Sequence, residues 1–217
     1  MRSAENVLDE IEYLVNKYGI REVFFQDDNM TISNKRMQKI CEGIIERGID
    51  LTWTCPSGVY IPSLSESLLA LMRKAGCYSL SFGIESGDQR ILDDIIHKKQ
   101  KLSYVKKVVE WCKKFGIKTT GYFILGIPGE TINSMMKTIN FASSCGLERA
   151  RFHICQPFPS TELHKNAVSK GYLTEDFDPT HLRVRTDTPV LRTKEFSPED
   201  ILRLKNIAEE TFRKKNR

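Results

Sequence analysis

The chain has 217 residues, a net charge of +5 and ordinary fractions of hydrophobic and charged residues, which fits one globular domain with a sizeable core. No apolar run approaches the roughly 18 residues of a membrane span, and no signal peptide precedes the first helical pattern, so we expect a cytoplasmic protein with no membrane partner. Basic residues are spread along the chain apart from a C-terminal cluster, which is typical of a helix end and does not favour nucleic acid as a partner (Arg213, Lys214, Lys215 and Arg217).

Helical and strand-like patterns alternate along the first 159 residues. A helix is expected over residues 5–18, where apolar residues recur at helical spacing between Ser3 as a cap and Gly19 as a stop. Short apolar runs indicate strands, and helical spacing returns between them. The later elements, in chain order, are a strand over 21–28, a helix over 33–47, a strand over 50–56, a helix over 63–76, a strand over 78–85, a helix over 102–116, a strand over 117–128, a helix over 131–146 and a strand over 148–159.

Strands that alternate with helices predict an α/β fold with a parallel sheet and crossover helices. The strands are nearly continuous apolar runs, as expected when both faces of a sheet are covered. We therefore predict an incomplete parallel (βα) barrel of the partial TIM-barrel type. The chain opens on a helix, so we expect the barrel's first strand to be missing. The strand near 23–26 would then have an exposed edge, or one covered by a second copy of the chain in a dimer.

The alternation ends after Pro159. A short helical stretch over 161–170 and a polar segment over 174–196 precede a final amphipathic helix, for which Ser197 is the expected cap and Pro198 the first residue. We expect two parts: residues 1–159 as the partial barrel, and residues 160–217 as a C-terminal extension whose final helix packs on it.

Carboxylates and small residues gather where the predicted strands end, which is where parallel βα folds bind ligands. Single residues there have a structural alternative, because acids and hydroxyls also cap helices and glycines also form turns. The adjacent acids Asp27 and Asp28 could hold a magnesium ion, although two acids alone are a weak signal. His153, inside an apolar strand, is interpreted as an interior hydrogen-bonding residue. The strand-end sets are 26–29, 55–58, 85–87, 126–131 and 156–161.

Four of these segments together resemble the radical S-adenosylmethionine superfamily, and in particular the branch often preceded by a cobalamin-binding domain. They are "VFFQDDNMT", "LSFGIESGDQRIL", "GYFILGIPGET" and "QPFPSTEL", and the resemblance covers nearly the whole chain. It implies a partial (βα)6 barrel in which a [4Fe–4S] cluster reductively cleaves S-adenosylmethionine to give a 5′-deoxyadenosyl radical. It also implies a reductant such as ferredoxin or flavodoxin, and it leaves room for cobalamin in a preceding domain.

The resemblance assigns cofactor-binding roles to residues at these strand ends. Asp27 and Asp28 match the place that meets the methionyl amino group. Glu85 and Ser86 match the place that hydrogen-bonds the ribose hydroxyls or the methionine part. The segment from Ile124 to Gly126 would line the adenine, and Gln156 with Pro157 would close its other side.

One part of the family pattern is absent, namely the Cys-x3-Cys-x2-Cys loop that binds the cluster. The six cysteines are scattered, have no metal-site spacing and are expected to be reduced thiols, so no metal ligand is assigned to them (Cys41, Cys55, Cys77, Cys112, Cys145 and Cys155). We expect the ligands to lie before Met1. The chain would then be a fragment of the catalytic domain, inactive by itself for lack of a cluster.

Two other functions stay open from the sequence. One is a cluster-free module that binds a nucleoside-like ligand. The other is an unrelated (βα) metal-dependent hydrolase or aldolase that uses Asp27, Asp28 and Glu85. The substrate and the reaction type are not indicated.

Overall fold

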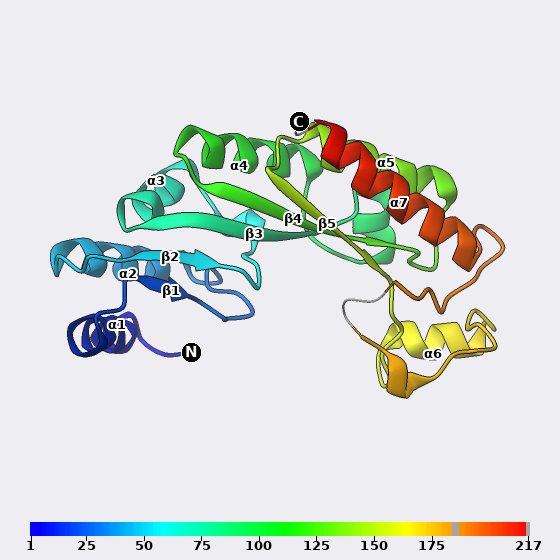
Figure 1. The fold of residues 1–217 in the computed structure, drawn as a ribbon, viewed down its shortest axis with the longest axis horizontal. Coiled ribbons are helices and arrows are strands. Elements are labelled where there is room, and N and C mark those ends of the chain that lie inside the picture. The colour runs from blue at the N-terminus through cyan, green and yellow to red at the C-terminus, as the bar shows by residue number, and fades with distance from the viewer. Residues whose placement is uncertain (184–186, 216–217) are drawn as a thin grey trace. The chain divides into compact units, whose positions relative to one another are not determined.

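The computed structural model describes residues 1–183 and 187–215 (Figure 1), so Arg217 of the basic cluster lies outside the described residues. The strands are β1 (Glu22–Phe24), β2 (Thr52–Cys55), β3 (Cys77–Glu85), β4 (Lys118–Leu125) and β5 (Arg149–Ile154). The α-helices are α1 (Ala4–Tyr18), α2 (Asn34–Glu46), α3 (Glu66–Lys74), α4 (Leu102–Lys114), α5 (Ile132–Ser144), α6 (Glu162–Ser169) and α7 (Pro198–Lys215).

These strands form one parallel sheet in the order β1-β2-β3-β4-β5, so each strand lies beside its neighbours in sequence. The pairing places Glu22 opposite Thr52 and Phe24 opposite Thr54, and it continues from Thr54 to Ser79. The sheet does not close, and β1 is one of its edges. The predicted α/β class and the incomplete parallel barrel are therefore confirmed.

Side-chain caps explain where many helices begin. Ser3 accepts the N–H of Asn6 and Ser33 accepts that of Arg36, so these serines begin α1 and α2. Thr131 forms a reciprocal capping box with Ser134 at the start of α5. The helical boundaries predicted from the sequence agree with these caps to within one to three residues, which is the usual uncertainty of helix ends.

The chain divides into two compact units. The first comprises residues 1–83, 100–121 and 146–149. In it α1 packs on α2, α2 on α3, and α3 on α4. Trp53 of β2 is fully buried, and its indole N–H donates to the carbonyl oxygen of Ala75 at 2.8 Å. This tie fixes the chain entering β3 against β2.

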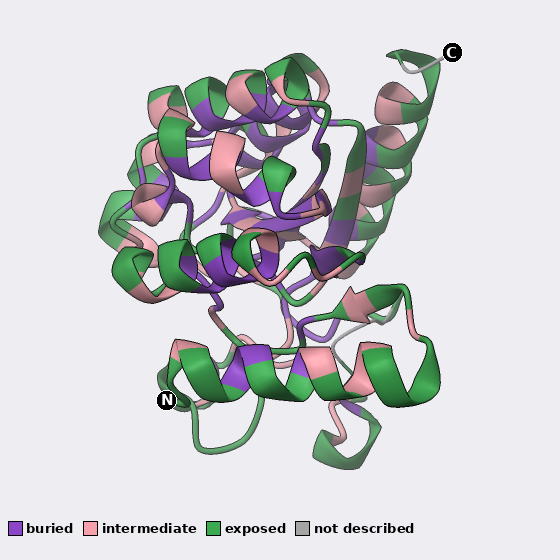
Figure 2. Ribbon diagram, turned by 90° about the vertical axis from the view of Figure 1, so that its left-hand side faces the viewer, coloured by how far each residue is buried: buried purple, intermediate pink, exposed green. Residues whose placement is uncertain are grey.

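The second unit comprises residues 84–99, 122–145 and 150–217. In it α7 lies against α5 (Figure 1), and the rings of Phe123 and Phe152 stack at 5.4 Å. The helices are buried along one side and exposed along the other (Figure 2). The predicted division at residue 160 does not coincide with these units and stays a prediction.

Short helical turns lie between the longer elements. A π-helical turn, η2 (Ile91–Ile95), follows β3, and single 3-10 turns cover Ile61–Ser63 and Pro179–His181. No helix among the described residues is both long and apolar enough to cross a membrane.

Candidate functional site

Glu85 ends β3 and lies beside a lysine. Its backbone has φ = 69°, which is rare outside glycine and marks a sharp change of direction. Lys98 Nζ donates to Glu85 Oε1 at 2.8 Å, with 26% and 22% of the two side chains exposed. The predicted acceptor at this strand end is thus a half-buried carboxylate with a cation already in contact.

The loop between the two residues explains this contact. After η2, His97 adopts the left-handed conformation with φ = 54°, and the Lys98 N–H donates to the Leu92 carbonyl oxygen at 2.8 Å. The chain therefore folds back on η2 and returns Lys98 to Glu85. π-turns and left-handed non-glycine residues are both enriched at functional sites.

Ser86 faces the helix α5. Its hydroxyl lies 3.1 Å from Thr138 Oγ1 and accepts the Asp88 N–H at 3.1 Å, and the side chain is fully buried. The neighbouring Gly87 donates its N–H to Thr138 Oγ1 at 2.9 Å. These bonds dock the end of β3 on α5, and the predicted cofactor contact of Ser86 stays a prediction.

Glycine is required at the end of β4. A Cβ at Gly126 would lie 2.6 Å from the Ile201 side chain, and the backbone there has φ = 84°. Ile124, two residues earlier, is half-buried, whereas Phe123 and Leu125 on the other face are fully buried. Of the predicted adenine wall, Ile124 is therefore the side chain that remains partly accessible.

Gln156 is half-buried after β5. Its Nε2 donates to the carbonyl oxygens of Cys155 and Thr188, both at 3.2 Å. The side chain thereby ties the end of β5 to the segment that precedes α7. His153 lies three residues earlier, within β5, and the centroid of its ring is 5.9 Å from that of the Tyr122 ring.

Glu130 was not singled out by the sequence, although it lies in the strand-end set after β4. Its Oε2 accepts the N–H groups of Gly126 and Ile127, each at 2.9 Å, and the side chain is fully buried. Its Oε1 is buried without a hydrogen-bond partner among the described residues. Burial raises the pKa of this carboxyl to about 7.

Asp27 and Asp28 belong to the first unit and follow β1. Both are exposed, and neither has a hydrogen bond or ion pair with any residue that the structure describes. Nearby, burial and then the Asp27 charge raise the pKa of the Cys55 thiol to about 12. Both carboxylates are therefore available as acceptors, and their predicted contact with the ligand's amino group stays a prediction.

The cysteines do not fit an iron–sulfur cluster. All six are buried free thiols, and burial raises the pKa of Cys41, Cys112 and Cys155 to about 12. Cluster ligands are thiolates. Within residues 1–183 and 187–215, no group of three or more histidine, cysteine or acidic residues could hold a metal ion.

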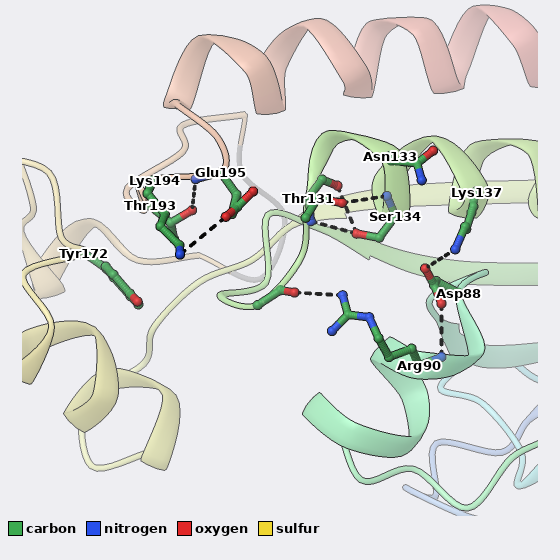
Figure 3. Close-up of a pocket in the computed structure, with 11 residues that line it drawn as sticks. Asp88, Arg90, Thr131, Asn133, Ser134, Lys137, Tyr172, Thr193, Lys194 and Glu195 are labelled. Atoms are coloured by element: carbon green, nitrogen blue, oxygen red, sulfur yellow. Dashed lines mark hydrogen bonds and ion pairs between the residues drawn. The ribbon is translucent and has the colours of Figure 1, made fainter.

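A polar hollow of about 510 Å³ lies at the start of α5 in the second unit (Figure 3). In it Lys137 pairs with Asp88 at 2.9 Å, and the Arg90 guanidinium donates to the Gly129 carbonyl oxygen at 3.0 Å. Its lining includes residues of the strand-end set after β4 and residues that follow the set after β3, and ligand binding at these strand ends stays a prediction. The lining residues are Asp88, Arg90, Gly129, Thr131, Asn133, Ser134, Lys137, Tyr172, Thr193, Lys194 and Glu195.

Comparison with known proteins identifies relatives of the chain. The sequence model described as the radical SAM superfamily matches residues 1–142. An uncharacterized methyltransferase of Pyrococcus horikoshii is 35% identical over 93% of this chain and 43% of its own length. The cytidylyl-2-hydroxyethylphosphonate methyltransferase of Streptomyces wedmorensis is 32% identical over 79% of this chain and 33% of its own length.

A solved structure supports the fold. The radical S-adenosylmethionine methyltransferase TsrM from Kitasatospora setae, solved with cobalamin and a [4Fe–4S] cluster bound, superposes with a TM-score of 0.64 and 18% identity. The match covers 71% of this chain and 29% of TsrM. The chain therefore spans less than half the length of each of these three proteins.

Proposed function

Because this chain belongs to the radical S-adenosylmethionine superfamily, we propose that it forms cofactor and substrate walls of an enzyme that reductively cleaves S-adenosylmethionine to start radical chemistry. The observation that carries the proposal is Glu85, a half-buried carboxylate held in a left-handed conformation at the end of β3. S-adenosylmethionine combines an amino group, a sulfonium and ribose hydroxyls, all of which a carboxylate attracts or accepts.

The described residues fit S-adenosylmethionine in kind. Asp27 and Asp28 offer free carboxylates for the amino group, and Glu85 offers an acceptor for the ribose hydroxyls or the methionine part. Ile124 and the bare backbone at Gly126 would line the adenine, with Gln156 on its other side. The Ser86 hydroxyl already has protein partners, so we propose that Ser86 acts chiefly by fixing Glu85 in place.

Lys98 adds a feature that the sequence did not predict. By neutralising Glu85, it lowers the cost of holding a carboxylate half-buried before a ligand arrives. The pair presents one oxygen that is bonded to Lys98 and one that can accept from a ligand.

The [4Fe–4S] cluster would be bound by thiolates outside this chain, since its own cysteines are buried and do not converge. By this proposal the chain alone is inactive and works as part of a longer cytoplasmic protein. That protein would need a one-electron reductant such as ferredoxin or flavodoxin, and a preceding domain could hold cobalamin, as in the branch that the sequence resembles. The open edge at β1 would pair with a further strand or with a second chain.

The alternatives are less well supported. Family membership removes the unrelated metal-dependent hydrolase, for which Asp27, Asp28 and Glu85 were the candidate ligands. A cluster-free module for nucleoside-like ligands would use the same adenine wall, so only ligand selectivity separates it from the proposed function.

Calorimetric titration of the chain with S-adenosylmethionine, S-adenosylhomocysteine and adenosine tests the proposal. Wild type should bind S-adenosylmethionine most tightly. The double variant Asp27→Asn, Asp28→Asn should lose more affinity for S-adenosylmethionine than for adenosine. Glu148→Gln is the matched control, because Glu148 is exposed just before β5, at the opposite end of that strand. Equal affinity for adenosine and S-adenosylmethionine would favour the nucleoside module instead.

A further inference from the structure

Glu130 supports the turn that follows β4 by an unusual arrangement. The turn runs from Gly126 to Gly129, and the Glu130 N–H closes it by donating to the Ile127 carbonyl oxygen at 2.9 Å. The side chain then folds back, and one oxygen accepts the N–H groups of both Gly126 and Ile127. These two donors lie just beyond the last residue of β4, where no further strand bond among the described residues serves them.

Burying a carboxyl group for this purpose is costly. A buried polar atom without a partner costs free energy, and a buried charge costs more. Glu130 Oε1 is such an atom among the described residues. In an exposed turn, water could accept hydrogen bonds from the same two N–H groups. The burial of the Glu130 carboxyl beneath this turn therefore indicates that the turn is held at a defined position.

We propose that Glu130 is a positioning residue, which through one carboxyl oxygen fixes the turn after β4 in the conformation that presents Ile124 to Gly126 to the cofactor. This inference rests on the proposed function for the identity of the ligand. It assigns Glu130 no contact with the ligand, because the carboxyl is enclosed behind the turn.

A neutral carboxyl suits this role. Oε2 accepts both N–H groups, so a proton taken from solvent resides on Oε1. Burial raises the pKa of Glu130 most, the N–H groups of Ile127 and Gly126 lower it, the Asp88 charge raises it and the Arg90 charge lowers it. Cys155 also faces Glu130, as a thiol whose own pKa is raised by burial. A glutamine has the same shape, with its amide oxygen as the acceptor and its NH2 group in the place of the protonated oxygen.

Hydrogen exchange at Gly126 and Ile127 tests the role without any ligand. When the turn opens, Glu130 is hydrated and its pKa returns toward 4.5, so opening becomes easier as the closed carboxyl ionises near pH 7. After correction for intrinsic exchange, these amides in wild type should exchange about tenfold faster at pH 8 than at pH 6. Glu130→Gln should remove this pH dependence and keep the protection.

Ligand titration at pH 6 completes the test. Glu130→Gln should bind S-adenosylmethionine within about twofold of wild type, whereas Glu130→Ala should bind at least about tenfold more weakly and lose protection at both amides. Glu148→Gln, an exposed acid just before β5 and away from the turn, should match wild type in every measurement.

The outcomes separate the two proposals. The positioning role is overturned if Glu130→Gln loses protection and affinity as Glu130→Ala does. It is also overturned if the exchange rates of both amides in wild type do not change with pH, and this second result does not depend on the folding of any variant. If the exchange results are as expected but wild type binds no S-adenosylmethionine, the proposed function and the cofactor part of this inference fail, while the support of the turn by Glu130 stands.

Discussion

Lys98 Nζ lies 2.8 Å from Glu85 Oε1, across a loop that contains a π-turn and the left-handed residue His97. The contact gives Glu85 a protein partner in addition to its proposed ligand. Two roles of one carboxylate, in folding and in binding, can therefore be measured separately.

The ion pair should contribute modestly to stability. Double-mutant analysis with Glu85→Gln and Lys98→Gln should give a coupling of about 1 kcal/mol, because the pair is partly shielded but still reaches solvent. Urea unfolding of the four proteins measures it. A coupling near zero would mean that the contact does not hold the loop.

Glu85 should contribute more to ligand binding than to folding. Glu85→Gln keeps the shape and one acceptor but loses the charge, and a hydrogen bond to a charged group contributes about 1.5–3 kcal/mol. The affinity for S-adenosylmethionine should fall by about one to two orders of magnitude. Titration and thermal melts of both proteins decide the matter, since unchanged affinity with a lower melting temperature would assign Glu85 to the fold alone.

Gly87 should be intolerant of a side chain. A Cβ there would lie 2.5 Å from Phe141 Cβ and 2.7 Å from Thr138 Cα, so backbone must move. Gly87→Ala should cost about 3 kcal/mol or more. Gly116→Ala is the control, because only its left-handed backbone opposes the substitution and about 1 kcal/mol is expected. Denaturant unfolding measures the free energy of unfolding of both variants. Similar losses for the two would show that the backbone at the β3–α5 contact moves easily to accommodate a side chain.

Glu130 should make stability depend on pH. Burial raises the pKa of Glu130 from its ordinary value of 4.5 to about 7, so the folded state holds the proton more tightly. The resulting stability is fully present below pH 4.5 and is lost as the pH rises through 7, by about 3 kcal/mol. Glu130→Gln should therefore equal wild type at low pH and exceed it at pH 8. Urea unfolding across this pH range measures the free energy of unfolding of both proteins. The same pH dependence in the two would contradict the assignment.

The chain should not assemble a cluster by itself. Its thiols are buried and their raised pKa values keep them protonated at neutral pH. Anaerobic reconstitution with iron and sulfide should leave well under one iron atom per chain after desalting. About four iron atoms per chain, with cluster absorbance, would contradict this expectation.

Much of the fold follows from the apolar pattern. Residues 78–85 alternate apolar side chains (Leu80, Phe82 and Ile84) with small ones, which is the period of a strand. The alternation of such short segments with stretches of helical spacing permits few arrangements other than a parallel sheet. The same reasoning placed Glu85 and Gly126 at strand ends, because βα crossovers put every such end on one side of the sheet.

Other parts of the site depend on geometry that the sequence does not display. The return of Lys98 to Glu85 requires a left-handed His97, for which no glycine or asparagine gave a signal. Glu130 follows a Gly-Ile-Pro-Gly turn, where an acid is ordinarily exposed, and its burial arises only when the turn folds over the side chain. The Ser86 hydroxyl turned toward α5 because Thr138 lies opposite it, 52 residues later.

Ile201 of α7 occupies the space that a side chain at Gly126 would need. The wall proposed for the adenine is thus backed by α7, a helix that lies outside the sheet and its strand ends. Substitutions on α7 could consequently change the shape of the proposed adenine wall through its backbone. Ile201→Val and Ile201→Leu would shift the backbone at Gly126 by different small amounts, with no change to any residue that faces the ligand.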